Sequence, residues 1–266
     1  MVATARFHRE RWSGQVSYTW SRSIDNQSEP LNGTFLSFNQ LAASTQPTPT
    51  SFLSALTQQF NSSLDRANSD FDQRQNLVFF AVWRLPAPAV PKLDALLRNW
   101  TVSSLGAIRS GLPFSAYSTL TLSNGPLIIY VNERPDLVSP AQAYTSSPSP
   151  GGRLLLNVAA FAPPGPNQIG TSGRNEFTGP GLIDADASLA RTLHARPWRE
   201  SLSVTLRADI YNVLNHANLN NPSSFYGSSK FGQALYGRTE VNSGFPLSQP
   251  LSESARQIQV MLQVRF

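Results

Sequence analysis

The last segment of the chain alternates strictly between two kinds of side chain. Apolar residues occupy every second position, at Ile258, Val260, Leu262, Val264 and Phe266. Four of the five residues at positions 257, 259, 261, 263 and 265 are polar. Because successive side chains of a β-strand point to opposite faces, the segment predicts a strand with one apolar and one polar face. Such strands occur both in soluble β-sandwiches and in the walls of membrane β-barrels.

The same period-two pattern predicts six further strands. They cover roughly residues 2–11, 14–23, 76–85, 100–110, 182–191 and 202–212, and the C-terminal segment 255–266 is the seventh. In the clearest of them Leu202, Val204 and Leu206 alternate with polar residues that include Arg207 and Asp209. The chain is therefore expected to be all-β and antiparallel.

Short and long connections alternate between these strands. A tight turn at residues 12–14, a modest link at 86–99 and a short link at 194–200 separate long connections at 24–74, 111–181 and 216–254. In an up-and-down sheet this order places every short turn at one end and every long loop at the other. Outer-membrane barrels have this asymmetry, with short periplasmic turns and longer extracellular loops.

The tryptophans follow the same asymmetry. Trp12, Trp83, Trp100 and Trp198 lie beside the short connections, whereas Trp20 lies toward the long-loop end. Tryptophan gathers where hydrocarbon meets polar head groups, because its ring is apolar and its N–H is a donor. We interpret these residues as aromatic girdles of a membrane barrel; the alternative is that they cap the core of a sandwich.

The amino-acid composition argues against several classes of protein and of binding site. Charged residues make up 14% of the chain, against roughly 25% in soluble domains. The chain has no cysteine and so no disulfide or thiolate metal site. The net charge of +5 comes mostly from scattered arginines, so no nucleic-acid partner is expected. No apolar run reaches the ~18 residues that a membrane helix needs, and Arg6, Arg9 and Arg11 interrupt any signal-peptide core.

The odd number of strands indicates an incomplete barrel. Single-chain bacterial barrels have even strand numbers, from about 8 upward. An open sheet would expose unpaired backbone groups to lipid at both edges. We therefore expect part of the barrel, including its N-terminal strands, to lie outside this chain.

Several short stretches of the sequence, taken in their order, resemble a known protein family. The stretches are "VSYTWSRSIDN" (16–26), "FDQRQNLVF" (71–79), "RSGLPFS" (109–115), "NERPDLV" (132–138), "NVAAFAPP" (157–164), "GRNEFTGPGLIDADASLAR" (173–191), "LRADIYNVLNHANLNNP" (206–222) and "RQIQVMLQVRF" (256–266). In this order they resemble the C-terminal part of the β-barrel of TonB-dependent outer-membrane receptors, and in particular the Oar-like branch, whose members also carry a carboxypeptidase-regulatory-like domain and a plug.

The resemblance implies an antiparallel up-and-down transmembrane β-barrel segment with long extracellular loops, in the outer membrane of a Gram-negative bacterium. Residues 1–266 would supply the last seven of about 22 strands, with no plug domain and no signal peptide of their own. The expected partners are outer-membrane lipid, the remainder of the receptor barrel and its plug, and indirectly the TonB system. The terminal Phe266 would be read by the barrel-assembly machinery; the alternative is an ordinary core phenylalanine.

The two faces of the strands then have separate predicted roles. The expected lipid-facing residues are Leu202, Val204, Leu206, Ile258, Val260, Leu262, Val264 and Phe266. The expected lumen-facing residues are Asp184, Asp186, Arg207, Asp209 and Arg265. These charges form either a docking surface for the plug or a ladder of ion pairs between neighbouring strands.

Candidate chemistry in the loops is weak. Asp65, Asp70 and Asp72 lack the glycine and glutamate of an EF-hand, so a solvated acidic loop is expected rather than a calcium site. The few histidines are separated and no G-x-S-x-G motif occurs, so a hydrolase is not favoured. No enzyme activity and no cofactor are predicted.

The loop at 222–238 is the strongest candidate for ligand contact. It places Phe225, Tyr226, Phe231 and Tyr236 among glycines and serines. Such a loop can stack on sugars or apolar ligands, or pack on itself. The expected function is substrate binding and uptake across the outer membrane, and the alternative is a soluble β-sandwich module that binds carbohydrate or protein.

Overall fold

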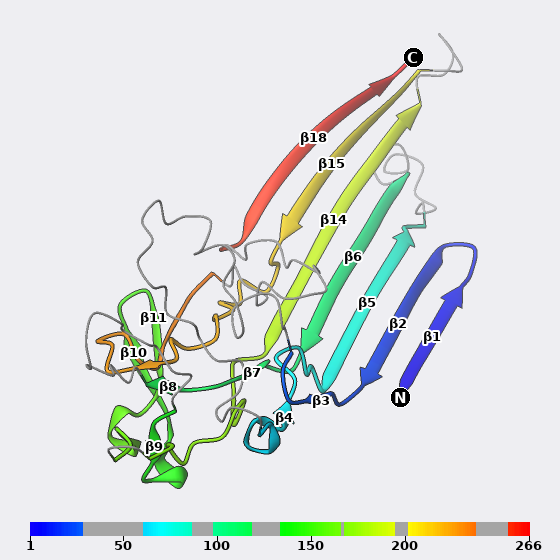
Figure 1. Ribbon diagram of the computed structural model, residues 1–266. Helices are drawn as coiled ribbons and strands as arrows, with labels where there is room; N and C mark the ends of the chain where they lie inside the picture. Colours follow the sequence, from blue (N-terminus) through cyan, green and yellow to red (C-terminus); the bar gives the residue numbers. More distant parts are fainter. Residues whose placement is uncertain (29–60, 87–97, 119–133, 166–167, 195–201, 238–254) are drawn as a thin grey trace, which may run out of the picture.

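A seven-stranded antiparallel sheet dominates the computed structural model, which describes residues 1–28, 61–86, 98–118, 134–165, 168–194, 202–237 and 255–266 (Figure 1). Its strands are β1 (Val2–His8), β2 (Trp12–Trp20), β5 (Gln75–Arg84), β6 (Trp100–Arg109), β14 (Leu182–His194), β15 (Ser203–Tyr211) and β18 (Gln257–Arg265). They lie side by side in chain order. The seven predicted strands and the up-and-down topology are confirmed.

The first turn differs from its prediction. The expected turn at residues 12–14 lies instead at Glu10 and Arg11, where the backbone groups of Arg9 and Trp12 bond to each other. Gly14 lies inside β2, opposite Phe7 of β1. A β-carbon at Gly14 would collide with the Phe7 ring and with the carbonyl oxygen of Phe80. This glycine therefore makes room for a ring and does not form a turn.

The register gives the sheet one apolar face. Directly opposed residues share a face, and Val204, Leu206 and Ile210 of β15 oppose Val264, Leu262 and Ile258 of β18. All predicted lipid-facing residues of these strands thus lie on one side, with Leu202 just before β15 and Phe266 just after β18. The side chains are not covered: Val260 is 68% exposed and Leu262 66% exposed. Such exposure does not fit the sandwich alternative, in which a second sheet would cover this face.

The opposite face carries the charges that were predicted to face a lumen. Ser188 opposes Asp209 and Ala190 opposes Arg207, which places these charges on the face away from the aliphatic stripe. Within the described part of the chain, however, no ion pair joins two strands of the sheet. Arg207 pairs with Asp209 two residues along its own strand, at 2.7 Å, and reaches Ser188 on β14 at 3.0 Å. The predicted ladder of cross-strand ion pairs is therefore not formed.

The two ends of the sheet differ as predicted. Trp12, Trp83 and Trp100 lie at the end where β1 turns into β2, and the rings of Trp12 and Trp83 stack with centroids 4.6 Å apart. Trp20 lies at the opposite end and is 57% exposed. Trp198 lies outside the described residues. The positions match two girdles, while contact with lipid head groups stays a prediction.

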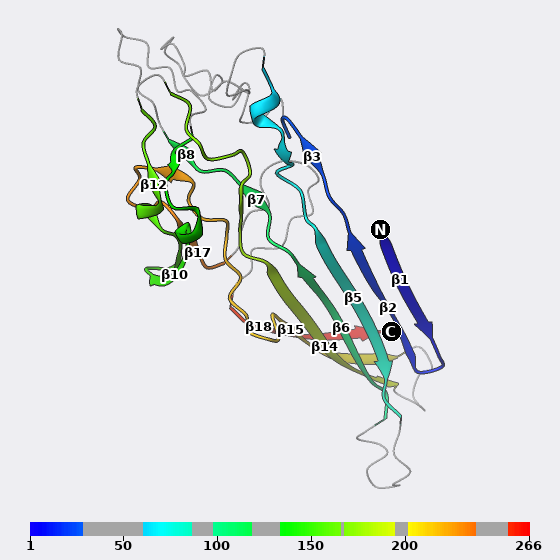
Figure 2. The same ribbon diagram turned by 90° about the horizontal axis from the view of Figure 1, so that it is seen from below.

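The long connections fold into a second body beyond one end of the sheet, which we call the loop lobe (Figures 1 and 2). Its short elements are β3 (Ile24–Asp25), η1 (Ser63–Asp65), β4 (Ala67–Asn68), β7 (Pro113–Phe114), β8 (Tyr117–Ser118), β9 (Asp136–Leu137), η2 (Pro140–Gln142), β10 (Tyr144–Ser149), β11 (Gly152–Leu156), η3 (Val158–Ala160), β12 (Phe161–Ala162), β13 (Phe177–Thr178), β16 (Phe225–Tyr226) and β17 (Gln233–Leu235). None of the described helical turns is long and apolar enough to cross a membrane.

Candidate functional site

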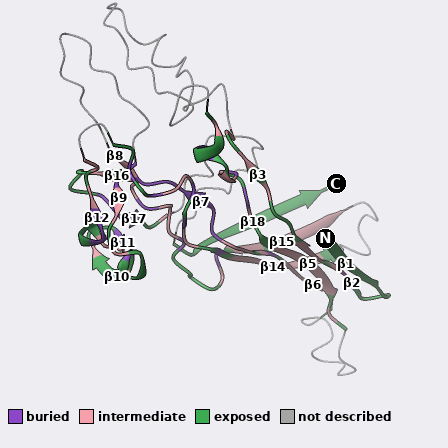
Figure 3. Ribbon diagram, turned by 60° about the horizontal axis from the view of Figure 1, so that its bottom comes forward, coloured by how far each residue is buried: buried purple, intermediate pink, exposed green. Residues whose placement is uncertain are grey.

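The buried core of the protein lies in the loop lobe and not in the sheet (Figure 3). Phe161 packs against Phe177 and Phe231, with ring centroids 5.5 Å and 5.1 Å away, and Phe177 packs against Phe114 at 5.7 Å. All four phenylalanines are less than 9% exposed. Because fully burying each of these side chains stabilises by about 1.5–3 kcal/mol, the lobe is a folded unit with its own core.

A buried ion pair ties two distant parts of the lobe together. Arg134 lies just before β9 and Asp65 ends η1, and their side chains are 6% and 3% exposed. The Arg134 guanidinium bonds to Asp65 Oδ1 at 3.0 Å, to the Ser172 carbonyl at 2.8 Å and to the Leu64 carbonyl at 3.3 Å. A buried charge needs such complete pairing, because removal of one partner leaves the other ion desolvated.

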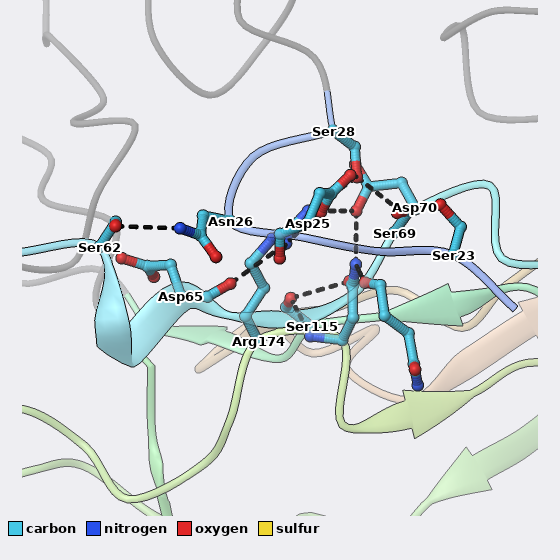
Figure 4. Close-up of polar contacts among 12 residues, drawn as sticks. Ser23, Asp25, Asn26, Ser28, Ser62, Asp65, Ser69, Asp70, Ser115 and Arg174 are labelled. Atoms are coloured by element: carbon cyan, nitrogen blue, oxygen red, sulfur yellow. Dashed lines mark hydrogen bonds and ion pairs between the residues drawn. The ribbon is translucent and has the colours of Figure 1, made fainter.

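A second arginine, Arg174, links the long connection after β2 to the one after β6 (Figure 4). Its Nη1 donates to Asp25 Oδ1 at 2.7 Å and to the Asp65 carbonyl at 3.2 Å. Its Nη2 donates to Ser28 Oγ at 2.7 Å and approaches Asp70 Oδ1 at 3.4 Å. Arginine suits this position because its planar fork presents several donors at once.

The next residue, Asn175, continues the network. Its backbone has a positive φ of 49°, a conformation that asparagine tolerates better than most residues. Its Nδ2 donates to the Asn68 carbonyl at 2.7 Å and to Asp70 Oδ1 at 2.6 Å. Its backbone N–H donates to Ser115 Oγ at 2.8 Å. The pair Arg174 and Asn175 therefore fixes one long connection against the other through five partners in the connection after β2, namely Asp25, Ser28, Asp65, Asn68 and Asp70.

The prediction of a solvated acidic loop is wrong for two of its three aspartates, whereas the side chain of Asp70 is 33% exposed. Asp65 is 2% exposed and Asp72 is 3% exposed, and Asp72 accepts a hydrogen bond from the Ser23 backbone. Sequence reasoning missed this because Arg134 and Arg174 lie far away along the chain. Among the described residues no group of three or more histidine or acidic side chains could hold a metal ion.

Asp25 is held in its charged form. Its burial favours the neutral acid, but hydrogen bonds from Arg174, Ser69 and Ser28 outweigh burial and keep the pKa of Asp25 below its ordinary value. The carboxylate and the Arg174 guanidinium are 23% and 11% exposed, so the pair is only partly screened by water. The network is consequently a rigid clamp at neutral pH.

The end of β15 carries a further polar clamp that sequence reasoning did not identify. Asn218 is 2% exposed; its Oδ1 accepts from the Ile183 backbone N–H at 3.0 Å and its Nδ2 donates to the Ile183 carbonyl at 2.9 Å. The side chain thus pairs with β14 beyond the end of β15. His216 bonds to Asn218 at 3.0 Å and to Asn212 through its backbone, which gives this histidine a structural role.

The four aromatic residues of the loop at 222–238 fall into two groups: two pack in the core of the lobe and two are exposed. Phe231 is 4% exposed and Tyr226 packs against the same core, so these two rings hold the lobe together. Phe225 and Tyr236 are 57% and 48% exposed. Phe225 lies against Tyr117 with centroids 6.1 Å apart, and burial raises the pKa of Tyr117. Only Phe225 and Tyr236 stay available for a ligand.

A groove of about 290 Å³ opens on the lobe. It lies between the β10–β11–β17 sheet and two passing segments, 178–180 and 219–222. Its lining residues are Tyr144, Thr145, Ser146, Arg153, Leu155, Thr178, Gly179, Pro180, Leu219 and Pro222. They supply hydroxyl-bearing side chains, one tyrosine ring and one guanidinium.

Comparisons with known proteins agree with this architecture. A family model described as "Outer membrane beta barrel domain" matches residues 1–259. No curated protein and no solved structure is significantly similar to the chain.

Proposed function

Because this chain belongs to the outer membrane β-barrel domain family, we propose that it is the C-terminal barrel segment of a TonB-dependent receptor of the Oar-like branch. The family places the protein in the outer membrane of a Gram-negative bacterium. In that setting the aliphatic face of the sheet contacts lipid and the charged face lines a water-filled interior. The segment takes part in binding a substrate and in its uptake.

The observation that carries this proposal is the joining of a two-faced sheet to a folded lobe at one end. The sheet has little core of its own, since Val260, Leu262 and Leu206 are all about half exposed or more. The lobe has a phenylalanine core and two arginine clamps. A protein that holds a rigid loop body over one end of a membrane wall can meet a substrate at that end.

The direction of the edge strands supports a larger barrel. Strands β1 and β18 form the two edges of the described sheet, and both run toward the end that holds Trp12 and Trp83. Two edges that run the same way cannot pair antiparallel with each other. Closure by antiparallel seams therefore needs an odd number of further strands, which a barrel of about 22 strands provides. Unpaired edge groups in lipid would otherwise cost several kcal/mol each.

The proposal also assigns each expected partner to a part of the sheet. The remainder of the receptor barrel pairs with the edges, and the plug meets the face that carries Asp184, Asp186 and Arg207. The TonB system acts on the plug and so reaches this chain indirectly. The exposed ring of Phe266, 92% accessible at the end of β18, is the contact for the barrel-assembly machinery.

Uptake by living cells tests the proposal. A strain that lacks the chain is compared with its parent for depletion of medium components by mass spectrometry, with and without a protonophore. We expect at least one component to be taken up only by the parent, and only while the proton gradient that drives the TonB system is intact. Depletion that is equal in both strains, or insensitive to the protonophore, would overturn the proposal.

A further inference from the structure

We infer that the groove on the loop lobe binds an acidic saccharide, with Arg153 taking the carboxylate. The inference deepens the proposed uptake function and, as a statement about substrate class, rests on it. The groove lies on β10 and β11 and faces the segments at 178–180 and 219–222. Its volume of about 290 Å³ is near the lower end of small-molecule sites, about 300 Å³, and suits one or two sugar units.

The walls of the groove are fixed before any ligand arrives. The Thr178 backbone N–H donates to the Tyr144 hydroxyl at 2.8 Å, which joins one wall to β10. Gly179 bonds through its N–H to the Leu112 carbonyl at 2.9 Å, and a β-carbon there would collide with Asn221. The Asn220 N–H donates to the Leu235 carbonyl of β17 at 3.0 Å. A preformed site loses little conformational entropy on binding.

The positive charge of the groove favours the binding of an anion. Among the described residues that line the groove, Arg153 is the one charged side chain and none is a carboxylate. Nη2 of Arg153 donates to Ser146 Oγ at 2.9 Å and approaches the Ser146 carbonyl at 3.4 Å. Within the described residues the Nε and Nη1 groups of Arg153 have no protein acceptor. A guanidinium that is oriented by a neighbour and keeps free donors can take a carboxylate in a two-pronged hydrogen bond.

The other residues that line the groove favour a ligand with a ring that carries hydroxyl groups. Thr145, Ser146 and Thr178 line the groove, and hydroxyl groups of this kind can exchange hydrogen bonds with sugar hydroxyls. The ring of Tyr144 is held edge-on against Phe177 at 6.1 Å, yet the residue is 54% exposed. Its free face can therefore cover the apolar face of a pyranose. Guanidinium, hydroxyl groups and aromatic face together match a hexuronic acid better than a neutral sugar or a simple carboxylate.

Titration of the full chain with small sugars tests the inference. The chain is purified in detergent from outer membranes and titrated with sodium glucuronate, glucose and sodium acetate, with binding followed by saturation-transfer NMR and calorimetry. We expect glucuronate to bind at least about tenfold more tightly than either glucose or acetate, since each lacks one half of the recognised group. Equal affinity for glucuronate and glucose would overturn the inference without any variant.

Matched variants locate the site. Arg153→Gln removes the proposed carboxylate partner, and Arg66→Gln removes a lobe arginine that does not line the groove. Glucuronate affinity should fall about tenfold or more in the first and stay unchanged in the second. Equal affinities in both variants would overturn the assignment of the groove. This result would leave the receptor proposal standing, whereas uptake insensitive to a protonophore would remove that proposal and leave sugar binding intact.

Discussion

The ring of Phe79 on β5 lies over Gly106, its direct partner on β6. A β-carbon built on Gly106 would meet the Phe79 ring and would lie 2.9 Å from the Asp184 carbonyl oxygen of β14. Phe7 covers Gly14 in the same way on the neighbouring strand pair. On the apolar face, a phenylalanine thus fills the space that each glycine leaves in the sheet.

Gly106→Ala is expected to destabilise the sheet by about 1–3 kcal/mol, the usual cost of overpacking. The added methyl group must displace either the Phe79 ring or the β14 backbone. Urea unfolding of the chain in detergent micelles measures the change. Ser104→Ala, two residues earlier on the same face of β6, is the control and should cost less than about 0.5 kcal/mol. Equal losses in the two variants would show that Phe79 does not depend on the glycine.

The two faces of β18 give a second prediction. Val260→Arg and Leu262→Arg place a charge on the apolar face, where a mid-membrane arginine costs about 2–4 kcal/mol. We expect lower levels of assembled protein in outer-membrane fractions. Gln259→Arg and Gln263→Arg are the controls, because they lie on the same strand but on the charged face. Normal levels of Val260→Arg and Leu262→Arg, or equal losses in all four variants, would contradict the assignment of faces.

The sheet could be predicted from the sequence because alternation and connection length are local signals. Strand β15 alternates from Val204 to Ile210, and the register then follows from placing all apolar residues on one side. The local signal fails at Gly14. A glycine at this point of the sequence suggests a turn, but Gly14 lies inside strand β2 and packs against the ring of Phe7. Nothing near Gly14 in the sequence reveals that a phenylalanine on the other strand will need its space.

The lobe could not be predicted, because its contacts join residues that are far apart along the chain. Arg134 and Asp65 are 69 positions apart, and Arg174 and Asp25 are 149 apart. Phe114, Phe177 and Phe231 stand beside proline, glycine or polar residues and Phe161 lies between two alanines, so no periodic pattern marks these residues as buried. One signal was available: Phe114, Phe161 and Phe177 each fall within a stretch that carried the family resemblance.

The Arg134–Asp65 pair gives a third prediction. Arg134→Gln should destabilise the lobe by about 3–5 kcal/mol, because Asp65 would remain buried without its counter-ion. Limited proteolysis of the purified chain, with urea unfolding, measures the loss. Arg66→Gln, which changes the residue next to Asp65 in the sequence, is the control and should be nearly neutral. The double variant Arg134→Met with Asp65→Leu should recover part of the loss, since it removes both buried charges. If Arg134→Gln resists protease as well as the control, the pair does not hold the lobe.

Acid is expected to loosen the clamp around Asp25. The folded pKa of Asp25 is lowered by its hydrogen bonds to Arg174, Ser69 and Ser28 despite partial burial, so the unfolded chain binds a proton more readily than the folded one. The resulting stability is fully present above the unfolded pKa, about 4, and is lost as pH falls through the lower folded value. Hydrogen exchange of the lobe amides between pH 3 and pH 6 should therefore show less protection at the acid end.

Asp25→Asn separates this effect from general acid denaturation. The amide keeps the shape of the side chain but cannot gain a proton in this range, so the variant should be less protected than the wild type at pH 6 and should lose less protection on acidification. Glu10→Gln, which removes an exposed carboxylate in the turn between β1 and β2, is the control and should follow the wild type throughout. The Arg174 contact would not govern the acid response if Asp25→Asn and the wild type lost protection in parallel.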